Sequence, residues 1–120
     1  MTDIVLTPAR TVDAPRLARD HVRALGLHRT EDATLLVSEL VTNAVRYGPE
    51  HGEIRLIIDP GATCTRFTVH DHGAGPLPEM RPGTSPTRDG GGHGLRLVDS
   101  VADRWGVERG STRVWFELDA

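Results

Sequence analysis

The longest apolar pattern in the chain covers residues 33–45 and predicts a helix that is buried on more than one side. Its apolar residues recur at helical spacing and cover most of the circumference, at positions 33, 36, 37, 40, 41, 44 and 45. Two polar side chains, Glu39 and Asn43, interrupt this pattern. Because they are four residues apart, they stack on one face of the helix. The helix is expected to cover residues 30–47, where a Gly-Pro pair ends it.

Shorter patterns predict the remaining elements. Alternating or short continuous apolar runs predict strands over residues 3–7, 52–59, 63–70, 105–108 and 113–118, and helical spacing predicts two further helices over 13–25 and 95–102. Most neighbouring strands are joined by turns that are too short for crossovers, so the sheet is expected to be largely antiparallel. The predicted fold class is therefore α+β, a two-layer sandwich of about five strands with about three helices on one face.

Composition limits the classes of protein that the chain resembles. Its 120 residues are expected to form a single domain, residues 1–120, with 26% charged and 38% hydrophobic residues. A net charge of −3 gives no general attraction to nucleic acid, and no apolar run reaches the length of about 20 residues that a membrane span needs. One cysteine excludes an internal disulfide and is typical of a reducing compartment. We therefore expect a cytoplasmic protein without direct nucleic-acid or membrane contacts.

Glu39 and Asn43 are the first candidate functional residues. Burying a carboxylate without a partner costs several kcal/mol, so such a group is normally paired, neutralised or bound to a metal. A glutamate and an asparagine that project together into a cavity indicate a site for a hard cation and for proton transfer. The alternative is that Glu39 belongs to the solvent-facing stripe of the helix.

Asp71 is the second candidate, because it ends a predicted strand and is followed by Gly73 and Gly75. A carboxylate at this point can only accept hydrogen bonds, and the glycines allow a flat group to approach the backbone closely. The alternative is a plain turn.

A segment rich in glycine and proline, about residues 73–92, is long enough for a lid or a binding loop. It ends in Gly92, His93, Gly94 and Leu95, which open a helix. Free backbone N–H groups at a helix N-terminus make a site for phosphate. The pattern is not a P-loop, because no Gly-Lys-Ser/Thr follows, and the dinucleotide-binding reading fails without a preceding βα unit. A flexible tether is the alternative.

Taken together and in this order, the three motifs resemble the N, G1 and G2 boxes of one ATPase superfamily. It includes DNA gyrase, a class of heat-shock chaperones, histidine kinases and mismatch-repair ATPases. The resemblance covers about residues 30–118 and implies the Bergerat-type ATP-binding fold. Within the superfamily, the phrases at 38–46, 94–99, 103–106 and 114–118 are similar to those of the bacterial anti-sigma-factor serine/threonine kinases.

The resemblance implies a role for each matching residue. Asn43 would ligate Mg²⁺, and Glu39 would be the general base that orients and deprotonates the attacking hydroxyl. Asp71 would accept a hydrogen bond from the exocyclic amine of adenine, and Gly73 and Gly75 would permit that approach.

The glycine-rich helix start would hold the phosphates of ATP. Gly92, Gly94 and Leu95 would direct backbone N–H groups at them, with His93 in the same nucleotide-binding segment and residues 76–91 as the lid. Thr112 matches a threonine that lies near the adenine-reading aspartate in several branches of the superfamily. Three arginines could each reach a phosphate, at positions 81, 88 and 96.

The implied function is that of a cytoplasmic, ATP- and Mg²⁺-dependent serine/threonine protein kinase. It would phosphorylate an anti-sigma antagonist, a small STAS-type protein, and it would also hold a sigma factor. The family also suggests a homodimer. Two alternatives stay open: a non-catalytic ATP-binding regulatory module, and a detached histidine-kinase-like ATPase domain that acts on a partner's histidine.

Overall fold

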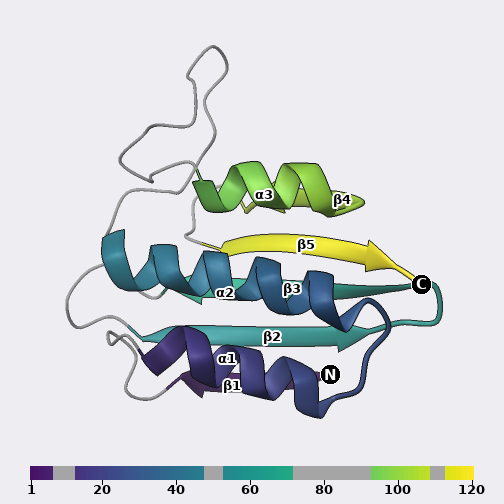
Figure 1. Cartoon of the computed structure of the whole chain (residues 1–120), viewed down its shortest axis with the longest axis horizontal. Coiled ribbons are helices and arrows are strands. Elements are labelled where there is room, and N and C mark those ends of the chain that lie inside the picture. Colours follow the sequence, from purple (N-terminus) through teal and green to yellow (C-terminus); the bar gives the residue numbers. More distant parts are fainter. Residues whose placement is uncertain (7–12, 48–52, 72–92, 109–112) are drawn as a thin grey trace.

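The fold is a five-stranded antiparallel sheet with three helices on one face (Figure 1). The computed structural model describes residues 1–6, 13–47, 53–71, 93–108 and 113–120. Its elements in chain order are β1 (Thr2–Leu6), α1 (Asp13–Ala24), α2 (Thr30–Tyr47), β2 (Ile54–Pro60), β3 (Cys64–Asp71), α3 (His93–Val101), β4 (Arg104–Val107) and β5 (Arg113–Asp119). The strand order is β1-β2-β3-β5-β4, and every neighbouring pair is antiparallel. The predicted α+β class and two-layer arrangement are confirmed.

Element boundaries differ from the predicted ones mainly where glycine obscures the pattern. α2 has the predicted bounds, and the strands are displaced by one or two residues. α3 begins at His93, two residues earlier than the apolar spacing predicts. The first turn of this helix therefore includes His93 and Gly94 as well as Leu95.

Strand alternation places the core between the sheet and the helices. The buried strand residues are Leu6 on β1, Ile54, Leu56 and Ile58 on β2, Thr65, Phe67 and Val69 on β3, and Val114, Phe116 and Leu118 on β5. Phe67 and Phe116 are cross-strand partners whose rings stack with centroids 4.8 Å apart. Such aromatic pairs add to the stabilisation from burial alone. The pair fixes β3 against β5 beneath the helices.

The outer face of the sheet carries ion pairs between neighbouring strands. Glu117 on β5 lies directly opposite Arg66 on β3 and Arg104 on β4. Its Oε1 accepts a hydrogen bond from Arg104 Nε at 2.7 Å, and its Oε2 accepts one from Arg66 Nε at 3.0 Å. The hydrogen bond from Arg104, and less strongly the one from Arg66, holds the pKa of Glu117 below its ordinary value of 4.5, while burial acts in the opposite direction. The folded state therefore favours the charged carboxylate.

Acid is expected to remove this contribution. Because the pKa of Glu117 is lower in the folded chain than in the unfolded chain, its stabilisation is fully present above pH 4.5 and is lost as the pH falls through the folded-state value. The melting temperature of Glu117→Gln should thus lie below that of the wild type at pH 6, with the gap closing on acidification. The matched change Glu31→Gln, which removes an exposed carboxylate of α2 outside this ion-pair network, is the control. A constant gap for Glu117→Gln would contradict the prediction.

Candidate functional site

Glu39 and Asn43 lie on one flank of α2. Ser38 marks the other flank, because its hydroxyl accepts a hydrogen bond from Arg19 Nη1 of α1 at 2.8 Å. α1 and α3 lie on either side of α2, and both pack against it (Figure 1). Helical periodicity then directs Glu39 and Asn43 toward the side of α3. Neither side chain is fully buried or fully exposed.

The polar residues of α2 divide into two groups. The hydroxyls of Thr34 and Thr42 donate to backbone carbonyls four residues earlier, both at 2.7 Å, so the helix itself satisfies them. Within the residues that the structure describes, the side chains of Glu39 and Asn43 have no hydrogen-bond or ion-pair partner. A half-buried carboxylate and a half-buried amide, one turn apart, are thus available to an external group.

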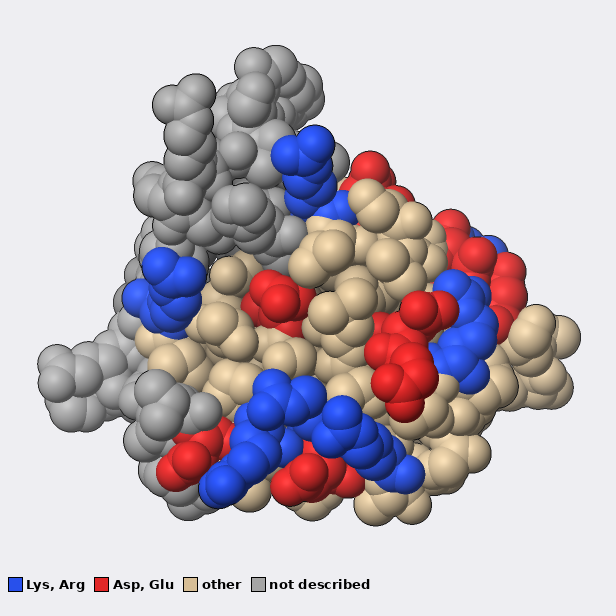
Figure 2. All heavy atoms as spheres, viewed as in Figure 1, with Lys and Arg blue, Asp and Glu red and all other residues tan. Residues whose placement is uncertain are grey.

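The surroundings also bear on whether Glu39 belongs to a solvent-facing stripe. The exposed stripe of α2 contains Leu35, which is 42% exposed, and Arg46. Glu39 lies between this stripe and the buried residues Leu36 and Leu40. Six of the seven apolar positions in the predicted pattern are buried, and the seventh, at 45, is half-buried. Glu39 therefore borders the core instead of pointing directly into solvent. Figure 2 shows an acidic side chain surrounded by uncharged surface over the middle of α2, with basic side chains gathered over α1.

Asp71 is the last residue of β3. Alternation along the strand places it on the same face as Phe67 and Val69, the face that the helices cover. It is half-buried and lies opposite Ile54, the first residue of β2. Figure 1 shows that the end of β3, the end of α2 and the start of α3 lie at the same end of the molecule.

α3 is anchored at this end by its own first turns. Leu95 is 1% exposed and Val98 is fully buried, and α3 packs against α2. The N–H groups of His93, Gly94 and Leu95 belong to the first helical turn, where helices leave them without an intrahelical partner. The Leu95 side chain therefore packs into the core, while its backbone N–H group can bind an anion. Arg96, one of the three candidate arginines, is exposed on α3.

The other predicted site residues lie outside the described residues. These are Gly73, Gly75, Gly92 and Thr112, together with Arg81, Arg88 and the whole of the lid at about 73–92. Among the residues that are described, no group of three His, Cys, Asp or Glu side chains is arranged to hold a metal ion. In the same ranges, no helix combines the length and the apolarity that crossing a membrane requires.

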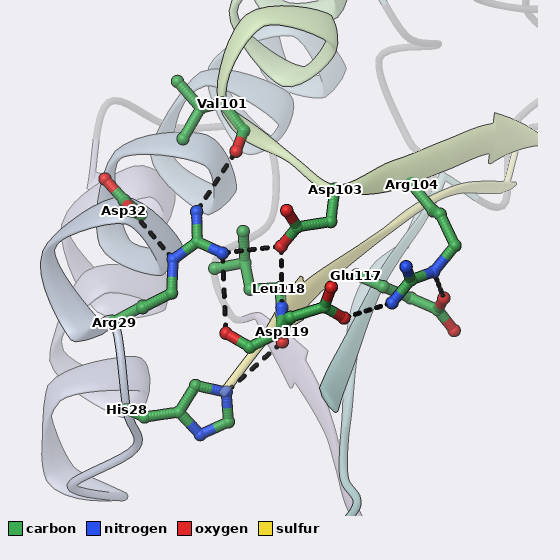
Figure 3. A network of polar contacts seen from close by, with 9 residues as sticks. All are labelled: His28, Arg29, Asp32, Val101, Asp103, Arg104, Glu117, Leu118 and Asp119. Carbon is green, nitrogen blue, oxygen red and sulfur yellow. Dashed lines mark hydrogen bonds and ion pairs between the residues drawn. The ribbon is translucent and has the colours of Figure 1, made fainter. Parts of the chain in front are cut away.

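Sequence reasoning did not identify Arg29, whose guanidinium connects four segments of the chain at the opposite end of α2 (Figure 3). Apart from Asp32, its partners are distant in sequence, at positions 101, 103 and 119, so no local pattern reveals them. Its backbone φ of 53° is uncommon for a residue with a Cβ. The sequence does not reveal that angle, because the angle depends on the fold.

Two comparisons with known proteins bear on this arrangement. A family model described as a histidine kinase-like ATPase domain matches residues 4–118, which is nearly the whole chain. A comparison with curated proteins gives no match.

Proposed function

The chain belongs to the family of histidine kinase-like ATPase domains, and from this premise we propose that it is a serine/threonine protein kinase of the anti-sigma-factor type. ATP binding and a regulatory role follow from the family. The finer proposal is that one domain, residues 1–120, transfers the γ-phosphoryl group of ATP to a serine or threonine of a STAS-type antagonist. The same protein would hold a sigma factor, and it would act as a homodimer in the cytoplasm.

One observation carries this proposal beyond ATP binding. Glu39 and Asn43 lack protein partners within the described residues, although neighbouring polar groups of α2 have them. A domain that only binds nucleotide has no need for a half-buried carboxylate beside the amide. Carboxylate and amide together suit a site where a cation is bound and a proton is removed.

Each of the two residues has a distinct proposed role. The side-chain oxygen of Asn43 would ligate Mg²⁺, whose remaining ligands would be phosphate oxygens and water, and the ion would neutralise developing charge on the phosphates. Glu39 would accept a hydrogen bond from the substrate hydroxyl and take its proton. The hydroxyl oxygen then forms a bond to the γ-phosphorus, and the bond to the β–γ bridging oxygen breaks, which releases ADP.

The remaining predicted residues would bind the nucleotide. Asp71 would accept a hydrogen bond from the amine of adenine, and the first turn of α3 would bind the phosphates through its N–H groups. The proposed binding set beyond Asn43 is Asp71, Gly73, Gly75, Gly92, His93, Gly94, Leu95 and Thr112. Asp71 and the start of α3 lie at the same end of the molecule, which supports a nucleotide extending between them (Figure 1).

The test is phosphoryl transfer from γ-labelled ATP, with Mg²⁺, to candidate STAS-type proteins and to proteins captured from the native cytoplasm. We expect label on one captured protein, stable to acid, as a serine or threonine phosphoester is. Label that acid removes would favour transfer to a histidine. Tight Mg-ATP binding without any transfer would favour the non-catalytic binding module.

A further inference from the structure

Arg29 precedes α2 directly and forms a network of polar contacts there (Figure 3). Its Nε donates to Asp32 Oδ2 at 3.1 Å, in the first turn of α2. Its Nη1 donates to Asp103 Oδ2 at 2.6 Å and to the carbonyl oxygen of Asp119 at 3.5 Å. Its Nη2 donates to the carbonyl oxygen of Val101 at 3.2 Å. One guanidinium thus joins α2, the last residue of α3, the α3–β4 connection and the end of β5.

The partners of Arg29 reinforce one another. Asp103 Oδ2 also accepts the backbone N–H of Asp119 at 2.7 Å. That backbone hydrogen bond, followed by the one from Arg29, lowers the pKa of Asp103, so the carboxylate stays charged. Beside it, His28 Nε2 lies 3.2 Å from the carbonyl oxygen of Leu118, within hydrogen-bond distance. The chain immediately before α2 is therefore fixed to the end of β5 at two successive residues.

The backbone conformation of Arg29 indicates that the surrounding structure holds this residue in one particular position. Its φ of 53° lies in the left-handed region, which residues with a Cβ rarely adopt. Such conformations persist where the surrounding structure determines them. From this position the side chain contacts Asp32 of α2 and extends to Val101 at the end of α3 (Figure 3).

α3 depends on contacts outside itself for its position. It has nine residues and is about 13 Å long, too short to be stable alone. Leu95 and Val98 hold it against the core, and Asp99 Oδ1 accepts a hydrogen bond from Trp105 Nε1 of β4 at 2.9 Å. Arg29 donates to the carbonyl oxygen of its last residue, Val101. These contacts together set the tilt of the helix, so losing the one from Arg29 allows the first turn, with the N–H groups of His93 and Gly94, to shift.

We propose that Arg29 is a positioning residue for the phosphates of the bound nucleotide: through α3 it sets where the first-turn N–H groups stand relative to Glu39 and Asn43. The proposal rests on the proposed function, because it assigns the phosphates to that turn. Arg29 itself would not contact the nucleotide. The adenine site at Asp71, on β3, does not depend on it.

The test compares Arg29→Met with Arg55→Met. Arg55 on β2 is a matched control, because it also pairs with two carboxylates, those of Asp3 and Glu53, and its side chain is 32% exposed against 31% for Arg29. We expect Arg29→Met to weaken Mg-ATP binding by roughly tenfold, while the affinity for adenosine changes by no more than about twofold. Arg55→Met should change neither. Arg29→Lys keeps the charge, but its single ammonium cannot reproduce the four contacts of the guanidinium, and it should lie between the wild type and Arg29→Met.

Each other outcome has a definite meaning. Equal losses for Mg-ATP and adenosine, or no loss, would overturn the positioning role. If the wild type binds neither compound, the proposed function fails. Amide hydrogen exchange without nucleotide then tests whether Arg29 holds α3 in position. Faster exchange across α3 in Arg29→Met than in Arg55→Met would support that part of the inference. Equal exchange in the two variants would overturn it.

Discussion

Replacing Glu39 with glutamine is expected to slow phosphoryl transfer by roughly 10²–10⁴-fold, the range that general acid–base catalysis typically contributes. Glutamine has the same length and can still accept a hydrogen bond from the substrate hydroxyl. It cannot take the proton. Because the side chain of Glu39 has no polar partner within the described residues, its replacement should disturb the helix little. The affinity for Mg-ATP should remain within a few-fold of the wild type, since Asn43 and the first turn of α3 are unchanged.

The measurement is single-turnover transfer to the phosphorylated partner, with nucleotide affinity determined separately by titration. Glu31→Gln, on the exposed surface of the first turn of α2, provides the same chemical change away from the site. It should leave both quantities near those of the wild type. Unchanged transfer in Glu39→Gln would remove this residue from the mechanism. A loss of affinity as large as the loss of rate would instead assign Glu39 to nucleotide binding.

Much of the fold could be predicted because the apolar periods are clear. The pattern around Leu36 and Leu40 gives α2 its bounds, since apolar residues recur at helical spacing up to a Gly-Pro stop. Alternation through Phe67 on β3 and Phe116 on β5 gives both the strands and their buried face. These signals are local, and neighbouring residues are sufficient to produce them.

The relation between α2 and α3 could not be predicted in the same way. It depends on Arg29, whose acceptors at Val101, Asp103 and Asp119 are more than seventy residues away in the chain. Arg29 has a left-handed φ, and because this position is not a glycine, the sequence does not indicate that conformation. Glu39 illustrates a related limit, because helical spacing alone allowed both a buried carboxylate and a solvent-facing one. Its half-buried position becomes known only once α2 is packed among its neighbours.

The candidate site combines parts that differ in how firmly they are held. Asp71 ends a strand that is paired along its length with β2 and β5 and fixed by the Phe67–Phe116 stack. α3 is a short helix whose position depends on its contacts with α2, β4 and Arg29. A nucleotide that joins them would have its purine on the rigid part and its phosphates on the part that Arg29 positions. Binding of the base should therefore be insensitive to changes that displace α3, and binding of the phosphates should not.

Replacing Asp71 with asparagine tests the rigid part, and it is expected to lower the affinity for ATP by about 100-fold, the upper range for a hydrogen bond with a charged partner. The asparagine amide keeps one acceptor oxygen, but it lacks the negative charge that strengthens the hydrogen bond, and its other end presents an N–H₂ group that cannot accept from the adenine amine. Preference for ATP over GTP should weaken in parallel, which competition between the two nucleotides measures. Asp59→Asn, near the far end of the adjacent strand β2, is exposed and should leave both values unchanged. An Asp71→Asn protein that still prefers ATP to GTP as strongly as the wild type would show that adenine is read elsewhere.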